Sequence, residues 1–188
     1  MQCTKFKGWY RLIDYEWKII ALNIPSAFKY ETDGGVGYRE CFDILRKTTN
    51  SAKNIKNFSE LMIFNILIGN NDAHGKNYSL LFNDDSINLA PAYDILCSCA
   101  YEKISKKMAM KIDKYYKFSD ITSKHIKNLC KECDISYPYF KKMILKQAEI
   151  LPDIVSEVAN SFKNTIGAKI LKVVQKNCKR IKNSIANE

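Results

Sequence analysis

The sequence predicts a mainly α-helical domain of the α+β kind, in which a small β-hairpin carries a polar loop. Apolar residues at helical spacing fill residues 60–69, and helix-favouring segments follow one another from residue 122 to the C-terminus. Between them, two short strand-like runs at 78–82 and 86–90 flank a polar turn. The chain has 188 residues, of which 46% are hydrophobic, and we expect residues 1–188 to form one domain.

The N-terminal part is expected to hold two short helices and a glycine-rich loop. Asp14 can cap a helix that ends near Leu22. Residues 29–37 read Lys-Tyr-Glu-Thr-Asp-Gly-Gly-Val-Gly, which is typical of a loop. Its glycines could cradle a phosphate with bare backbone N–H groups, or could serve only as turn residues. A second helix is expected over residues 38–47.

The apolar helix is the expected centre of the domain. Residues 48–57 are polar and predict a linker, after which Ser59 can cap a helix over residues 60–69. That helix is apolar on nearly all sides, so it should be buried. Gly69 is suited to end it, because glycine readily adopts the left-handed conformation that follows many helices. The chain would then leave the core at Asn70.

Beyond the hairpin, the pattern predicts one more strand and then helices only. Residues 108–112 could form a strand, and Thr122 or Ser123 could cap a helix that ends at Cys133. Another helix is expected over residues 137–151, with Pro152 starting or kinking the next one, which runs to Phe162. The last helix is expected over residues 165–185. Its inward side should hold Ile166, Ile170, Val173, Val174 and Ile181.

The net charge of +10 lies entirely in the second half of the chain. Residues 1–100 carry eleven basic and eleven acidic side chains, whereas residues 101–188 carry nineteen and nine. Such a surface could meet nucleic acid, an anionic membrane or an acidic protein, or could simply be a solvated helix face. The basic residues of the last segment are Lys163, Lys169, Lys172, Lys176, Lys179, Arg180 and Lys182.

Seven cysteines include one CxxC pair, Cys130 and Cys133. A structural zinc site normally takes four ligands, and His125 is the nearest further candidate. Reduced, partly buried thiols are the simpler interpretation. No apolar run reaches the roughly 18 residues of a membrane-spanning helix, and the N-terminus lacks a signal-peptide pattern, so no membrane contact and a cytoplasmic location are expected.

The polar loop after the apolar helix has the spacing of a phosphoryl-transfer site. Asp72 is followed at the fifth position by Asn77, and Asp94 comes after the hairpin. In protein kinases an aspartate accepts the proton of the attacking hydroxyl, and an Asn and an Asp hold magnesium. Magnesium prefers such oxygen ligands and is completed by phosphate oxygens of ATP and by water. The simpler interpretation is an Asx-rich turn with Asp94 as a helix cap.

Two further side chains lie inside this loop. His74 could contact a phosphate of ATP or orient Asp72, and it could equally brace the loop through a hydrogen bond. Lys76 could neutralise phosphate charge, although one lysine among thirty basic residues is weak evidence. Both are predicted to be nucleotide-binding residues.

The motif-bearing segments resemble a known family. Residues 64–77, Phe-Asn-Ile-Leu-Ile-Gly-Asn-Asn-Asp-Ala-His-Gly-Lys-Asn, and residues 89–95, Leu-Ala-Pro-Ala-Tyr-Asp-Ile, resemble the C-terminal domain of HipA-type serine/threonine kinases, as does the loop at 29–37. These kinases are toxins of bacterial toxin–antitoxin systems. The resemblance implies a protein-kinase-like C-lobe with Asp72 as catalytic base and Asn77 and Asp94 as magnesium ligands. It also implies ATP as co-substrate, a protein substrate such as an aminoacyl-tRNA synthetase, and a DNA-binding antitoxin as partner.

The resemblance also implies a missing part. Family members carry a β-rich N-lobe with a phosphate-covering loop and an ATP-binding lysine, but only about ten residues precede the similar region here. We therefore expect a lobe that needs a separate N-lobe protein. The alternative is an inactive remnant that binds an antitoxin, or nucleic acid through its basic last helix. Lipid kinases and small-molecule phosphotransferases share related loops, but Pro91-Ala92-Tyr93-Asp94 favours the toxin family.

Overall fold

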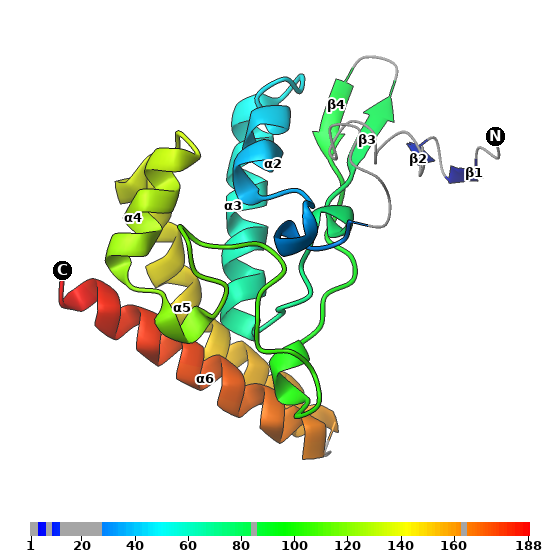
Figure 1. Cartoon of the computed structure of the whole chain (residues 1–188). Coiled ribbons are helices and arrows are strands. Elements are labelled where there is room, and N and C mark those ends of the chain that lie inside the picture. Colours follow the sequence, from blue (N-terminus) through cyan, green and yellow to red (C-terminus); the bar gives the residue numbers. More distant parts are fainter. Residues whose placement is uncertain (1–3, 7–8, 12–27, 84–85, 163–164) are drawn as a thin grey trace.

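The computed structural model describes residues 4–6, 9–11, 28–83, 86–162 and 165–188. The domain is mainly helical, as the sequence predicts, with a small antiparallel sheet at one side (Figure 1). The helix expected over residues 14–22 lies outside the described residues. The α-helices are α2 (Tyr38–Leu45), α3 (Ser51–Ile68), α4 (Ser123–Glu132), α5 (Tyr137–Phe162) and α6 (Thr165–Ala186).

The predicted hairpin is present. Its strands pair in the register Leu80↔Leu89 and Phe82↔Ile87. Two further strands extend the sheet through one pairing, of Tyr10 with Phe82. The sequence did not predict these two strands, because the N-terminus mixes basic and aromatic residues without a clear period. The strands, which lie in chain order across the sheet, are β1 (Thr4–Phe6), β2 (Trp9–Arg11), β3 (Leu80–Asn83) and β4 (Ser86–Leu89).

Helix α3 lies at the centre of the domain and is longer than predicted. The expected linker over residues 48–57 is wrong, because α3 already begins at Ser51. Ser59 is therefore not a cap: it lies inside the helix, buried, and its hydroxyl donates to the carbonyl oxygen of Ile55 at 2.8 Å. Gly69 does end the helix in the left-handed conformation, with φ of 76°. The helix buries a row of apolar side chains that includes Phe58, Met62, Ile63 and Leu67.

Helices α5 and α6 pack against the side of α3 that faces away from the sheet, and α4 packs on α5 and α6 (Figure 1). Pro152 does not separate two helices, because α5 is continuous through it and Leu151 beside it is buried. Packing against α6 offsets the hydrogen bond that proline cannot donate. In α6, Val174 and Ile181 are buried as predicted, and Ile166, Ile170 and Val173 are partly buried.

The expected strand over residues 108–112 is wrong. This segment is irregular apart from a bridge between Ile112 and Tyr115, although Met108, Met110 and Ile112 are buried. Helix α4 begins after Thr122, as predicted. Among the residues described, no helix is both long and apolar enough to span a membrane.

Candidate active site

Buried asparagines shape the start of the polar loop. The side-chain amide of Asn70 donates to the side-chain oxygen of Asn65 at 2.9 Å, and its backbone N–H donates to the Asn65 carbonyl at 2.8 Å. The Asn65 amide donates in turn to the hydroxyl of Tyr78 at 3.2 Å. All three residues are buried, and these bonds join them into one network, in which the Asn70 side-chain oxygen is left without a hydrogen-bond partner among the described residues. This pairing fixes the direction in which the chain leaves α3.

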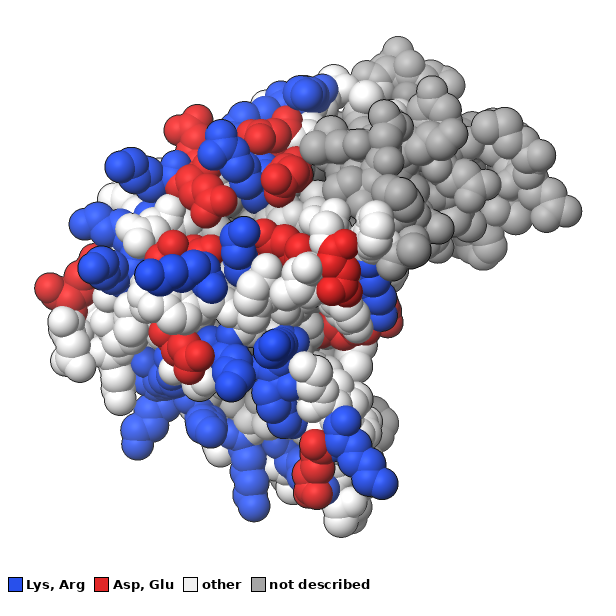
Figure 2. All heavy atoms as spheres, viewed as in Figure 1, with Lys and Arg blue, Asp and Glu red and all other residues white. Residues whose placement is uncertain are grey.

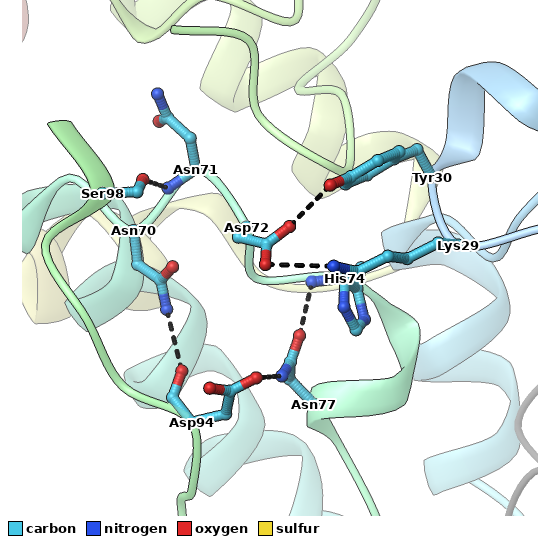
Figure 3. Close-up of polar contacts among 9 residues, drawn as sticks. All are labelled: Lys29, Tyr30, Asn70, Asn71, Asp72, His74, Asn77, Asp94 and Ser98. Atoms are coloured by element: carbon cyan, nitrogen blue, oxygen red, sulfur yellow. Dashed lines mark hydrogen bonds and ion pairs between the residues drawn. The ribbon is translucent and has the colours of Figure 1, made fainter. Parts of the chain in front are cut away.

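Asp72 is held by two residues of the loop that begins at residue 28 (Figure 3). The ammonium group of Lys29 lies 3.2 Å from Asp72 Oδ2, and the Tyr30 hydroxyl donates to Asp72 Oδ1 at 2.8 Å. The hydrogen bond to Asp72, followed by burial, raises the pKa of the Tyr30 phenol, so its hydroxyl remains a donor at neutral pH. The Asp72 side chain keeps 32% of its surface exposed and is therefore open to a substrate.

The next residue anchors this loop. Glu31 donates its backbone N–H to the carbonyl of Ala109 at 3.0 Å, and its carboxylate accepts from the Lys111 backbone N–H at 2.8 Å. The same carboxylate makes an ion pair with the Lys111 ammonium group at 2.9 Å. Sequence reasoning assigned residues 29–37 to a loop but missed these contacts, since they join segments that lie far apart in the chain.

The hairpin brings Asn77 and Asp94 together, as the sequence predicted. The Asn77 side-chain amide lies 2.5 Å from Asp94 Oδ2, and the Asn77 side-chain oxygen accepts from the His74 backbone N–H at 3.0 Å. Asp94 has a positive φ of 55°, which is strained for a residue with a side chain. The Asn70 side-chain amide donates to the backbone carbonyl of Asp94 at 3.4 Å (Figure 3). Strain of this kind often marks functional sites.

His74 is buried and has an unpaired ring nitrogen. Only 5% of its surface is exposed, and Nδ1 has no hydrogen-bond partner among the described residues. Burial, with a smaller contribution from Lys29, lowers the pKa of the imidazole, so the ring is neutral at neutral pH. Lys76 is half-buried in the following turn, where its carbonyl accepts from the Tyr93 hydroxyl at 2.6 Å. The predicted roles of both residues stay predictions.

A cleft of about 290 Å³ opens beside Asp72. It lies between the loop at Tyr30 and the segment after Asp94, and its lining includes Asn71, Asp72, Ser98 and Met108. Ser98 supports this wall: its hydroxyl accepts from the Asn71 backbone N–H at 2.8 Å. Asn77 and Asp94 do not line the cleft, so Asp72 is the member of the set that faces it. A segment bound in the cleft could present a hydroxyl group to Asp72.

The CxxC pair lacks the features of a zinc site. Cys130 and Cys133 are buried, and burial raises the pKa of each thiol to about 12. Zinc binds the thiolate, which is disfavoured in such surroundings. Across the described part of the chain, no group of three or more His, Cys, Asp or Glu side chains could hold a metal ion. A magnesium site at Asn77 and Asp94 would take only two ligands from the protein.

Known proteins are similar to this chain in sequence. Putative kinase Y4mE of Sinorhizobium fredii is 33% identical over 139 residues, which are 73% of this chain and 33% of that protein. The serine/threonine-protein kinase toxin HipA of Shewanella oneidensis is 34% identical over 79 residues, 42% of this chain and 18% of that toxin. The chain thus spans well under half the length of these relatives.

The fold has a counterpart among solved structures. A chain of the complex of HipA, HipB and operator DNA from Shewanella oneidensis MR-1 matches with a TM-score of 0.83 and 21% identity. The match covers 88% of this chain and 43% of that chain. The sequence profile of the HipA-like C-terminal domain matches residues 14–166. The chain therefore belongs to the HipA-like C-terminal domain family.

Proposed function

We propose that this chain is the C-terminal lobe of a HipA-like serine/threonine protein kinase of a cytoplasmic toxin–antitoxin system. The kinase transfers the γ-phosphate of ATP to a protein hydroxyl. The supporting observation is that the chain returns Asp94 to within 2.5 Å of Asn77, in the polar loop that also carries Asp72 (Figure 3). Because the chain spans a third of Y4mE, the activity belongs to the complete kinase, in which an N-lobe on the same or a separate polypeptide covers the nucleotide.

The donor atoms at Asn77 and Asp94 fit magnesium. Both side chains carry an oxygen, the ligand that this hard ion prefers, and the contact of the Asn77 amide nitrogen with Asp94 Oδ2 supports a shared site, in which the Asn77 oxygen would turn from the His74 N–H to the ion. The bound ion would neutralise charge on the ATP phosphates. The unpaired Nδ1 of His74 is a buried polar atom in the same loop, and it could accept a hydrogen bond from a bound water or substrate group.

Asp72 serves as the general base in this proposal. Its exposed carboxylate faces the cleft and can accept the proton of a substrate hydroxyl. Tyr30 and Lys29 fix the direction of the carboxylate, one oxygen each. A base held in place needs no reorientation when the hydroxyl arrives, and such positioning accounts for much of catalysis in phosphoryl transfer.

The test is binding of magnesium-ATP, followed by a kinase assay. We expect Asp94→Ala to abolish magnesium-ATP binding measured by isothermal titration, with the N-lobe supplied where the chain alone does not bind. Asp134→Ala is the matched control, since Asp134 also has a positive φ, of 50°, but lies outside the site. Asp72→Asn should retain nucleotide binding and lose phosphorylation of substrate. A complex that phosphorylates equally well with Asp72→Asn would refute the proposal.

A second candidate is a binding module for an antitoxin or for nucleic acid. Figure 2 shows basic side chains gathered over α6, and of its lysines Lys169 and Lys182 make ion pairs, with Glu102 at 3.7 Å and Glu149 at 2.9 Å, whereas Lys172, Lys176 and Lys179 make none within the described part of the chain. Such a surface suits phosphate groups. Duplex DNA binding that weakens steeply with salt would support this candidate, and undetectable binding at low salt would exclude the nucleic-acid version.

A further inference from the structure

A second, larger cavity lies on the other side of Asn71 from the Asp72 cleft. It measures about 340 Å³ and is formed by the C-terminal end of α3, the middle of α6 and two loop segments, 99–106 and 117–119. Four of its lining residues are basic: Lys106, Lys117, Lys176 and Arg180. None of the described residues that line it is acidic. A concave site with this charge attracts anions.

The basic groups are not neutralised by carboxylates in contact with them. Arg180 donates to the carbonyl oxygens of Phe118, Ser119 and Ile121, and Lys106 donates to those of Cys99 and Tyr101 at 3.0 and 2.9 Å. These partners are neutral, so they orient the cations without cancelling their charge. Lys117 and Lys176 are exposed, and neither makes an ion pair within the described part of the chain.

The remaining walls are apolar and amide-bearing. Ile66, Val173 and the Phe118 ring line the cavity, and the Arg180 guanidinium lies 5.0 Å from the centre of that ring. The Asn177 amide donates to the carbonyls at the end of α3, which fixes this wall. A cavity of at least about 300 Å³ with apolar walls and a few convergent polar groups is typical of a small-molecule site. Flat basic surfaces, by contrast, suit nucleic acid.

We propose that this cavity binds a small molecule that carries a phosphate group, with the phosphate on Lys117, Lys176 and Lys106 and the organic part against Phe118 and Val173. The site is separate from the phosphoryl-transfer site, because Asp72, Asn77 and Asp94 do not line it. It goes beyond the proposed kinase activity and does not depend on it.

Asn71 connects the two cavities. It lines both, and its backbone is held by Ser98 on one side and by the Ala109 N–H, at 2.8 Å, on the other. Its side chain donates to Cys99 Sγ at 3.1 Å, on the wall of the basic cavity (Figure 3 shows Asn71 beside Asp72). A ligand in the basic cavity would therefore contact the residue that precedes the proposed base.

The experiment titrates pyrophosphate and adenosine monophosphate into the full chain in EDTA, which removes the magnesium that nucleotide binding at Asn77 and Asp94 requires. The test variant is Lys117→Gln/Lys176→Gln. The matched control is Lys142→Gln/Lys146→Gln, which removes the same charge from exposed positions on α5. We expect at least about tenfold weaker binding in the test variant and a change below about twofold in the control. Asp94→Ala should bind as the wild type does.

Three results would overturn the proposal. Equal losses in both double variants would mean that the probes respond only to net charge. A phosphoserine peptide that binds at least about tenfold more tightly than either probe would assign the cavity to a protein segment instead of a small molecule. Loss of binding in Asp94→Ala would place the probes in the phosphoryl-transfer site. Magnesium-ATP binding, measured separately on the same variants, tests the kinase proposal alone.

Discussion

The contact between Tyr30 and Asp72 should contribute more to stability than the ion pair between Lys29 and Asp72. Tyr30→Phe removes only the hydroxyl that donates to Asp72 Oδ1 at 2.8 Å, and the ring can keep its edge contact with His74 at 6.2 Å. Lys29→Met removes the ammonium group at 3.2 Å from Oδ2 and keeps most of the aliphatic stem. The two variants therefore separate a hydrogen bond from an ion pair at the same carboxylate.

The expected contribution of each contact to the free energy of unfolding follows from the type of bond and from how far its side chains are exposed. A hydrogen bond to a charged group typically contributes about 1.5–3 kcal/mol, and because Tyr30 is 36% exposed, we expect this one to contribute at or just below that range, at about 1–1.5 kcal/mol. The side chains of Lys29 and Asp72 are 41% and 32% exposed. Water and salt screen such a pair, whose usual contribution is about 0–1 kcal/mol.

The assay is a double-mutant cycle on the free energy of unfolding in urea. Tyr30→Phe and Lys29→Met are each combined with Asp72→Ala, and the interaction free energy of each pair is taken from the four unfolding curves. Tyr139→Phe with Asp72→Ala is the control cycle, because Tyr139 is exposed on α5 and far from Asp72 in sequence. That cycle should give no coupling.

A Lys29–Asp72 coupling free energy larger than the Tyr30–Asp72 coupling free energy would contradict this prediction. A coupling below about 0.5 kcal/mol between Tyr30 and Asp72 would show that their hydrogen bond does not hold the carboxylate. A Lys29 coupling that exceeds the Tyr30 coupling and persists in high salt would show that the ion pair is the main constraint.

Three further predictions concern the frame of the site. Gly69→Ala should destabilise the fold by more than Gly34→Ala, as measured by thermal unfolding, because both have positive φ but only at Gly69 would an added Cβ meet side chains, the nearest at 2.8 Å. The lowered pKa of buried His74 means that the folded state resists protonation. Stability should therefore fall as the pH drops below the unfolded histidine pKa of about 6.5, and His74→Gln, unlike the control His125→Gln, should remove that part of the pH dependence in urea unfolding. Pro152→Ala should raise the free energy of unfolding by at least about 1 kcal/mol, since proline inside a helix is unfavourable; an unchanged or lowered melting temperature would contradict this.

The sequence predicted most of what depends on local periodicity. The apolar spacing of α3, the turn of the β3–β4 hairpin and the capping residue Thr122 are local signals, and each led to the right element. The hairpin also implied that Asn77 and Asp94 would meet, because two antiparallel strands return the chain to its starting point.

Contacts between distant segments could not be predicted in the same way. Lys29 and Tyr30 contact Asp72 from a loop that Glu31 anchors through bonds to residues 109 and 111, far along the chain. The same bonds explain the failed strand at 108–112. Ala109 bonds to the backbone of Glu31 and Asn71 instead of to a strand, and the chain bends at residues 109 and 110, so the alternating apolar residues do not form a sheet there.

The polar start of α3 shows how a pattern that suggests a linker can support a site. Asn54 is buried inside the helix, where its amide donates to the Ile87 carbonyl at 3.2 Å and its side-chain oxygen accepts from the Leu89 N–H at 3.0 Å. Asn54 thus bonds to a backbone carbonyl and to a backbone N–H of β4, whose outer edge has no partner strand among the described residues. Because β4 leads directly to Asp94, the polar residue that made 48–57 look like a linker fixes the strand that returns the chain to Asn77.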